Sequence, residues 1–141
     1  MTHRIPTILL IDDEAFDQKM YQRVILRSGL VGKTLSFLYA DEALAFLVRQ
    51  DHGPADVILL DINMPRMNGF EFLAAATDQL GATFARVVVV MLTTSLEPSD
   101  RERAKGFSAV RGFINKPLTA EHLSEIAVLL DNANDQAVLT R

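Results

Sequence analysis

Asp56-Val57-Ile58-Leu59-Leu60 is the stretch that decides the fold, because it is apolar at four successive positions and Asp61 follows at once. A strand with one face in water alternates apolar and polar residues, whereas an unbroken apolar run indicates a strand covered on both faces. Similar β-rich runs lie at residues 7–11, 34–38, 87–92 and 112–115. The sequence therefore predicts five strands, three of which are apolar nearly throughout.

The segments between these runs have helical spacing. Apolar residues recur three or four positions apart in three of them: Phe16, Met20 and Val24; Ala43, Leu44 and Leu47; Phe70, Leu73 and Ala74. Asn68 and Glu71 are three residues apart, as in a capping box that opens a helix. Five strands alternating with five helices predict the α/β class, with a parallel sheet covered by helices on both faces.

Composition limits the class of protein. The chain has 141 residues, enough for one domain, and 49% of them are hydrophobic, which excludes wholesale disorder. The net charge of −4 gives no basic field for nucleic acid, and the absence of cysteine excludes disulfides and thiolate metal sites. The longest strongly apolar run, residues 87–92, is too short to span a bilayer, and residues 1–6 lack a signal-peptide core. We expect a soluble cytoplasmic protein.

Polar residues stand where the predicted strands end. Ligands of parallel sheets bind beyond the carboxyl ends of the strands, and these ends carry Asp12-Asp13, Asp61, Thr93 and Lys116. Each also has a simpler interpretation. An Asp before Ala15 can cap a helix, an Asp that ends a strand can form a turn, and a terminal Thr can bond its own backbone. Lys116 precedes a proline, which favours an extended conformation that aims the ammonium into the crevice.

Taken together, these residues predict a cation site. Three carboxylates that converge on one crevice repel one another, and Lys116 offsets only one charge. A residual charge of about −2 and ligands that are all oxygen atoms suit a hard divalent cation, Mg²⁺ or Mn²⁺. With such a cation bound, Asp61 meets no net negative barrier when its oxygen attacks phosphorus, and an aspartyl phosphate is a known covalent intermediate.

Four motifs in order resemble the receiver domains of bacterial two-component response regulators: IDDE at 11–14, LDINMPRMNG at 60–69, LTTS at 92–95 and GFINKPL at 112–118. The resemblance implies a doubly wound, flavodoxin-like (βα)5 fold with a five-stranded parallel sheet in strand order 2-1-3-4-5. It extends over residues 7–130, which leaves residues 1–6 as an N-terminal extension and residues 131–141 as a C-terminal tail.

The resemblance also assigns roles to single residues. It implies that Asp12, Asp13, Asp61 and the backbone carbonyl of Asn63 hold Mg²⁺, and that Asp61 is the phosphoacceptor. Lys116 contacts the phosphoryl group, Thr93 bonds one of its oxygens on activation, and Phe113 turns inward when Thr93 moves. Three further positions tune access to the acyl phosphate and its loss: Asn63, Thr94 and Ser95.

The function implied is a single-domain response regulator, which is not an enzyme except in catalysing its own phosphotransfer and slow autodephosphorylation. Its phosphodonor is a sensor histidine kinase or a histidine phosphotransfer protein. Its output is a conformational switch of the fourth helix, fifth strand and fifth helix toward a protein target or a second copy, with no nucleic acid or membrane partner. The alternatives are an intermediate receiver in a phosphorelay and a small phosphohydrolase with an Asp nucleophile.

Particular residues weigh against other classes. A phosphohydrolase needs a second acid–base carboxylate two residues after the nucleophile, where this chain has Asn63. A nucleotide-binding domain needs a glycine-rich loop after the first strand, where this chain has Asp12-Asp13. A receiver that serves only as a scaffold would have lost a site residue, and a DNA-binding output would need more chain than residues 131–141.

The last predicted helix, from Ala120 to about residue 132, has an apolar stripe that we expect in the core: Leu123, Ile126, Ala127 and Leu130. Val128 and Leu129 fall off this stripe, at 100° or more from its centre by the ~100° turn per residue. Two interpretations stay open for them. They are either isolated apolar surface residues, which are normal, or part of a surface for a partner or a second copy.

Overall fold

The computed structural model describes residues 4–49, 51–94 and 97–134. Five strands form one sheet in the order β2-β1-β3-β4-β5, and every neighbouring pair is parallel. Their bounds are β1 Ile5–Ile11, β2 Val31–Phe37, β3 Val57–Asp61, β4 Val88–Thr93 and β5 Val110–Asn115. The predicted fold class and strand order are confirmed.

Three strands begin before their predicted starts, and one of them is β1, which begins at Ile5 rather than at residue 7. β2 begins at Val31, three residues before the predicted start at residue 34, and β5 begins at Val110 rather than at residue 112. Both are edge strands in which most residues remain partly or fully exposed, so hydrophobicity alone does not mark their beginnings. The beginning of β2 is set by strand pairing instead, because its ladder with β1 starts at the pair Ile5 and Val31.

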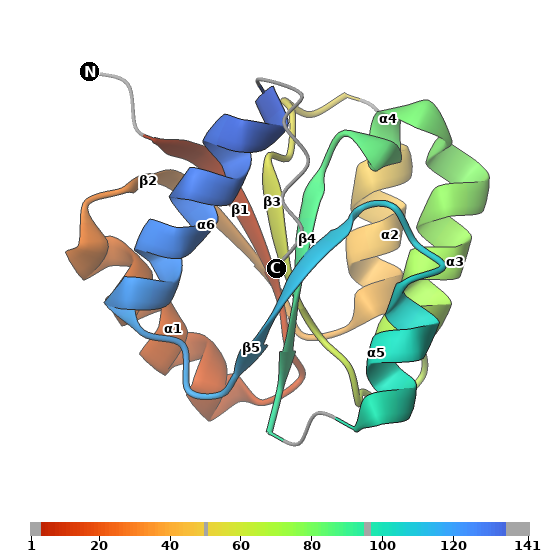
Figure 1. Ribbon diagram of the computed structural model, residues 1–141, viewed down its shortest axis with the longest axis horizontal. Coiled ribbons are helices and arrows are strands. Elements are labelled where there is room, and N and C mark those ends of the chain that lie inside the picture. The colour runs from red at the N-terminus through yellow and green to blue at the C-terminus, as the bar shows by residue number, and fades with distance from the viewer. Residues whose placement is uncertain (1–3, 50, 95–96, 135–141) are drawn as a thin grey trace.

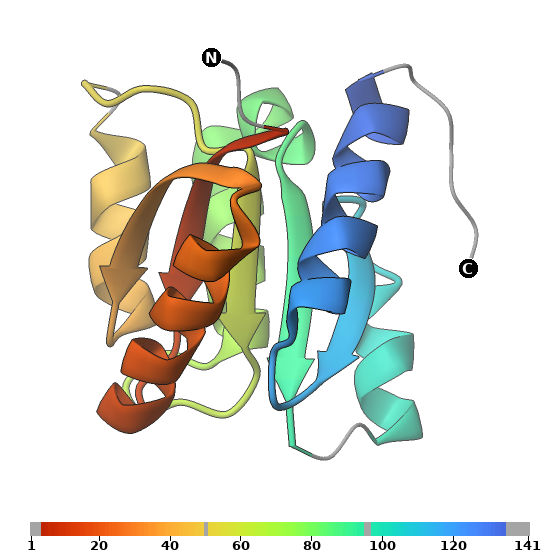
Figure 2. The same cartoon turned by 90° about the vertical axis from the view of Figure 1, so that its left-hand side faces the viewer.

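Helices cover both faces of the sheet. Figure 1 views the sheet edge-on, with α1 (Ala15–Ser28) and α6 (Ala120–Asn134) on one side and the remaining helices on the other: α2 (Ala40–Val48), α3 (Gly69–Leu80), α4 (Ala82–Ala85) and α5 (Pro98–Ala104). Figure 2 looks at the face covered by α1 and α6, where all strands run in one direction. The short α4, which follows Gly81 at φ 56°, is a sixth helix that the sequence did not predict.

The three central strands are buried on both faces, as their apolar runs predict. Leu9, Ile58 and Met91 pack in the cluster beneath α2, α3 and α5. Their neighbours Leu10, Leu59 and Val90 point the other way and pack beneath α1 and α6. Successive residues of a strand point to opposite faces, so an unbroken apolar run supplies two cores at once.

The buried side of α1 differs from the apolar stripe seen in the sequence. Phe16 of that stripe is 71% exposed, whereas Gln18 and Tyr21 are buried. Gln18 is buried because its side-chain amide donates to the backbone carbonyls of Leu10, Asp12 and Phe37 at 3.2, 3.0 and 2.9 Å. These bonds satisfy the amide nitrogen, whereas Gln18 Oε1 is buried without a hydrogen-bond partner among the described residues. α1 therefore turns a polar residue toward the strand ends through its nitrogen alone.

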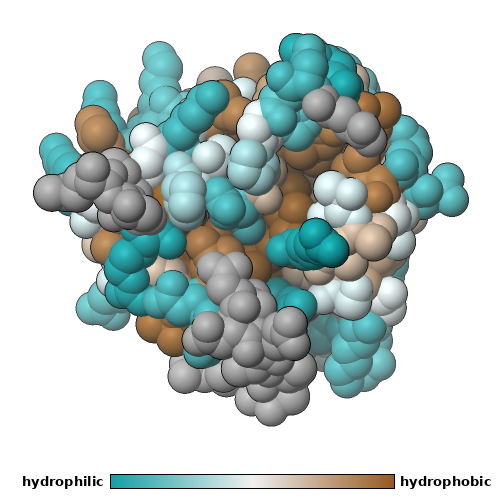
Figure 3. Space-filling model, turned by 90° about the horizontal axis from the view of Figure 1, so that it is seen from above, coloured by the Kyte–Doolittle hydropathy of each residue, from teal (hydrophilic) through white to brown (hydrophobic). Residues whose placement is uncertain are grey.

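The end of the sheet where the strands begin has a hollow of about 540 Å³ with both apolar and polar lining residues. Figure 3 views the molecule from this end and shows apolar side chains gathered in the middle of the face. Six apolar residues contribute to its lining: Leu47, Ala55, Leu80, Phe84, Val87 and Leu130. Among the described residues, no helix is long and apolar enough to cross a membrane.

Candidate functional site

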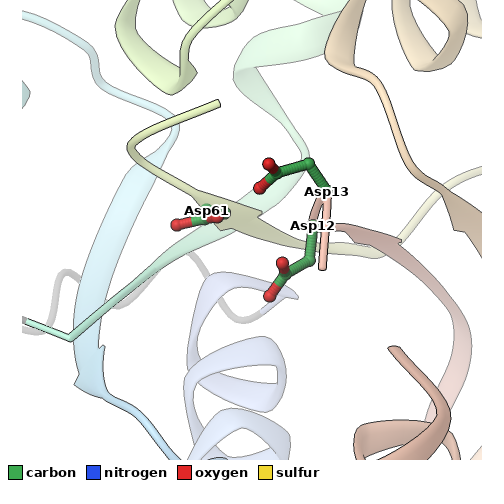
Figure 4. Close-up of side chains that lie close together, drawn as sticks. All are labelled: Asp12, Asp13 and Asp61. Carbon is green, nitrogen blue, oxygen red and sulfur yellow. The ribbon is translucent and has the colours of Figure 1, made fainter. Parts of the chain in front are cut away.

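Three aspartates converge where β1 and β3 end. Asp12 and Asp13 follow β1, Asp61 is the last residue of β3, and these two strands are neighbours in the sheet. One carboxylate oxygen of each lies within 4.8 Å of the others, and Figure 4 shows the three side chains around this strand end. The predicted convergence of Asp12, Asp13 and Asp61 is therefore present in the fold.

Lys116 reaches the same crevice from the end of β5. Its ammonium lies 2.7 Å from Asp12 Oδ2 and 3.7 Å from Asp61 Oδ2, and its side chain is only 8% exposed. The Lys116 backbone is tied to β4, because its N–H donates to the Thr93 carbonyl at 2.8 Å. The bond to Pro117 is cis. The ammonium is thus held against the aspartates, as the sequence predicts.

The electrostatics of the crevice favour binding of a proton or a cation. Burial raises the pKa of Asp61 to about 7; Lys116 opposes this shift, and the charges of Asp12 and Asp13 add to it. For Lys116, burial lowers the pKa, but the hydrogen bond to Asp12 and the charge of Asp61 outweigh burial, so its pKa is raised overall. The lysine therefore stays positively charged, and its single charge cannot neutralise all three aspartates.

Asp12 is not the N-cap residue of α1, although one of its oxygens bonds just before that helix. One of its oxygens, Oδ1, accepts a hydrogen bond from the Glu14 backbone N–H at 3.0 Å, just before α1 begins, and the other faces Lys116. Glu14 itself is the N-cap residue of α1, and its side chain makes no cap bond. Asp12 therefore supports the turn into α1 and supplies charge to the crevice, but neither it nor Asp13 is the N-cap of the helix.

Further predicted site residues stand at or after the carboxyl ends of β3 and β4. Thr93 is the last residue of β4 and is buried, and it pairs with Asn115 immediately before Lys116. Asn63 and Thr94 are exposed. Ser95, one of the residues predicted to tune loss of the phosphoryl group, lies outside the described residues.

Phe113 lies on β5 beside a cavity of about 430 Å³ between α5 and α6. Its ring is half-buried, and the Arg101 guanidinium lies 5.1 Å from the ring centroid. Val128 and Leu129 line the same cavity, and Val128 is 40% exposed. Leu123, Ile126, Ala127 and Leu130 are buried, so the predicted core stripe of the last helix is confirmed.

Two residues near the crevice were not identified from the sequence. Asp17, in the first turn of α1, places its Oδ2 3.4 Å from the Lys116 ammonium. Its signal was available, because an acidic residue in the first turn of the helix that follows Asp12-Asp13 lies near the same strand end. Gly69 is the second: a Cβ there would lie 2.7 Å from the Asp61 carbonyl oxygen, so only glycine fits where α3 meets β3.

The sequence of this chain is similar to those of sensory and response-regulator proteins. The sensory/regulatory protein RpfC of Xanthomonas campestris is 29% identical over 95% of this chain, but the chain spans only 17% of the length of RpfC. The response regulator Rcp1 of Synechocystis is 33% identical, over 66% of this chain and 65% of Rcp1. The sensor histidine kinase CheAY of Helicobacter pylori is 31% identical over 84% of this chain and 14% of its own length.

Solved structures of similar proteins have the same architecture. A two-component response regulator from Cytophaga hutchinsonii superposes with a TM-score of 0.84 at 27% identity, over 91% of this chain and 98% of that one. The chemotaxis protein CheY4 of Vibrio cholerae gives 0.74 at 28% identity, over 89% and 98%. The family model described as response regulator receiver domain matches residues 8–128. The chain therefore belongs to the receiver domains of two-component response regulators.

Proposed function

We propose that Asp61 accepts a phosphoryl group from a phosphohistidine, and that Asp12, Asp13, Asp61 and the backbone carbonyl of Asn63 hold the Mg²⁺ that this reaction needs. The observation that carries the proposal is the meeting of three carboxylates and one buried ammonium at the carboxyl ends of β1, β3 and β5. Carboxylate oxygens are the ligands that Mg²⁺ prefers, and Mn²⁺ suits them too.

The reaction forms one bond and breaks one. An Asp61 carboxylate oxygen attacks phosphorus, the bond from phosphorus to the histidine nitrogen of the donor breaks, and that nitrogen keeps the electron pair. The bound metal supplies neutralisation of the phosphoryl oxygens. Lys116 is already within 3.7 Å of Asp61 Oδ2, so its ammonium needs little movement to pair with a phosphoryl oxygen.

The conformational response is assigned to Thr93 and Phe113. The Thr93 hydroxyl stands at the end of β4 next to the acceptor strand, where it would bond a phosphoryl oxygen. Thr93 on β4 pairs with Asn115 on the neighbouring β5, and Phe113 lies on β5 two residues before Asn115. The two proposed switch residues are therefore on adjacent strands. The output surface is then α5, β5 and α6, which correspond to the fourth helix, fifth strand and fifth helix of the predicted fold.

The partners proposed are proteins. A sensor histidine kinase or a phosphotransfer protein donates the group, in keeping with relatives that are themselves sensor kinases. A second candidate is an intermediate receiver that passes the group on to a histidine phosphotransfer protein, and the similarity to the sensory/regulatory protein RpfC and to the sensor kinases supports it. With a net charge of −4, neither nucleic acid nor a membrane is proposed as a partner. We assign this activity to the cytoplasm and to a domain of residues 7–130, flanked by residues 1–6 and 131–141.

Intact-mass analysis tests the acceptor. The protein treated with acetyl phosphate and Mg²⁺ should gain one phosphoryl group, stable in acid and labile in base, and Asp61→Asn should gain none. Chelating the metal should abolish the gain in the unaltered protein. Modification of Asp61→Asn at the rate of the unaltered protein would refute the assignment. Transfer from the phosphorylated protein to a histidine phosphotransfer protein would favour the phosphorelay candidate over a terminal regulator.

A further inference from the structure

Lys116 has an anionic partner outside the aspartate cluster. The Asp17 carboxylate accepts a hydrogen bond from the Lys116 ammonium at 3.4 Å, which is shorter than the 3.7 Å to Asp61. Asp17 comes from α1 and is not one of the three aspartates whose oxygens gather within 4.8 Å. The ammonium therefore lies between the aspartate cluster, which can hold a divalent cation, and the single carboxylate of Asp17.

A bound cation and the ammonium draw on the same charges. Asp12 and Asp61 both lie in the cluster and both face Lys116, so any attraction of the ammonium to them opposes binding of a second cation there. Asp17 offers the ammonium a carboxylate that is not part of the predicted cation site. It also holds the ammonium back from any negative group that is added to Asp61.

We propose that Asp17 is a positioning residue that divides the Lys116 ammonium between a resting contact on α1 and the phosphoryl group on Asp61. The inference rests on the proposed function of Asp61. In the resting protein, Asp17 keeps negative charge available to the cation. In the phosphorylated protein, Asp17 competes with the phosphoryl group for the ammonium and so weakens that state.

Two opposite effects follow when the charge of Asp17 is removed. In Asp17→Asn, the ammonium turns fully to the cluster, so Mg²⁺ binding should weaken by roughly three- to tenfold, as expected for the loss of one partly exposed ionic contact. At saturating Mg²⁺, beryllofluoride, an analogue of the phosphoryl group, should bind more tightly by a similar factor. A residue with a merely structural role would weaken both.

The experiment measures both constants by calorimetry in the full chain: Mg²⁺ alone, then beryllofluoride at saturating Mg²⁺. Glu14→Gln is the matched control, because it removes the same charge at the start of α1 from an exposed side chain that makes no cap bond. It should change either constant by less than about twofold. Asp17→Glu restores the charge and should return both constants toward those of the unaltered protein, and thermal melting verifies that each variant is folded.

The outcomes separate this inference from the proposed function. Weaker Mg²⁺ binding with tighter beryllofluoride binding in Asp17→Asn alone supports the role of Asp17. Parallel weakening of both, no change in either, or equal effects in Glu14→Gln would overturn it. Absence of beryllofluoride binding in the unaltered protein would instead contradict the proposed phosphoacceptor.

Discussion

Asp12 illustrates how a single residue can both support a turn and supply charge to a site. Its Oδ1 accepts from the Glu14 N–H while its Oδ2 faces Lys116. The spacing of Asp12 from the strand before it and the helix after it allows both contacts, and only coordinates show that the two oxygens point in different directions. Asp17 was not predicted as a site residue, because a single acidic residue in the first turn of a helix is common. Its partner Lys116 also lies 99 positions away in the sequence.

The raised pKa of Asp61 predicts a pH-dependent stability in the metal-free protein. Its pKa is about 7 in the folded state, above the unfolded value of about 3.9, so the folded state binds this proton more tightly. The stability from this group is therefore complete below about pH 4 and is lost as the pH rises through about 7. Relative to the unaltered protein, Asp61→Asn should gain roughly 1–3 kcal/mol across that window and then level off.

Urea unfolding with a chelator present, at several pH values from 5 to 9, measures this difference. Glu14→Gln, which alters an exposed carboxylate, serves as the control and should show no such trend. A free-energy difference between Asp61→Asn and the unaltered protein that stays constant over the range would contradict the assigned pKa.

Elements were predictable where local rules decide them. The Asn68 side chain accepts from the Glu71 N–H, and Glu71 accepts from the Asn68 N–H, both at 2.9 Å, so the predicted capping box at α3 is confirmed. The face of α1 was not predictable in this way. Burying Gln18 depends on carbonyls at the ends of β1 and β2, which are brought together only by the tertiary fold.

The capping box should contribute measurably to stability. Asn68→Ala removes the acceptor for the Glu71 N–H and should lower the free energy of unfolding by about 1 kcal/mol. Glu71→Gln keeps the reciprocal bond and should stay within a few tenths of a kcal/mol of the unaltered protein. Denaturant unfolding of the three proteins decides this, and equal stability of Asn68→Ala and Glu71→Gln would argue that solvent replaces the cap at no cost.

For the molecule as a whole, the alternation of strands and helices was sufficient to predict a parallel sheet with two helical layers. The apolar runs of β1, β3 and β4 fixed the centre of that sheet, because burial on both faces leaves no polar alternation. The beginnings of the strands were less well predicted, as β1, β2 and β5 show, since they depend on pairing. The site followed from the fold, because strand ends that are distant in sequence meet at one edge.

The cavity lined by Phe113, Val128 and Leu129 predicts an output at the level of assembly. Replacing both Val128 and Leu129 with Ser should leave phosphorylation of Asp61 unchanged and shift self-association or target binding. Sedimentation with and without beryllofluoride measures the self-association. Glu121→Ser, on an exposed position of α6 outside the cavity lining, is the control. Unchanged assembly in both forms, with target binding also unaffected, would leave Val128 as an ordinary surface residue and Leu129 as a partly buried residue packed against the core.

Because the strands are all parallel, the proposed metal and phosphoryl residues lie at or just after the carboxyl ends of strands, and the segments that enter the strands carry none of them. The sequences of the loops at the two ends of the sheet can therefore diverge at different rates in evolution. A peptide inserted before β3 or before β4 would meet the end shown in Figure 3, far along the strands from Asp61. Loops of this kind tolerate insertions. Evolution, or an engineer, can thus add a binding loop or a reporter there while the chemistry at the opposite end is left as it is.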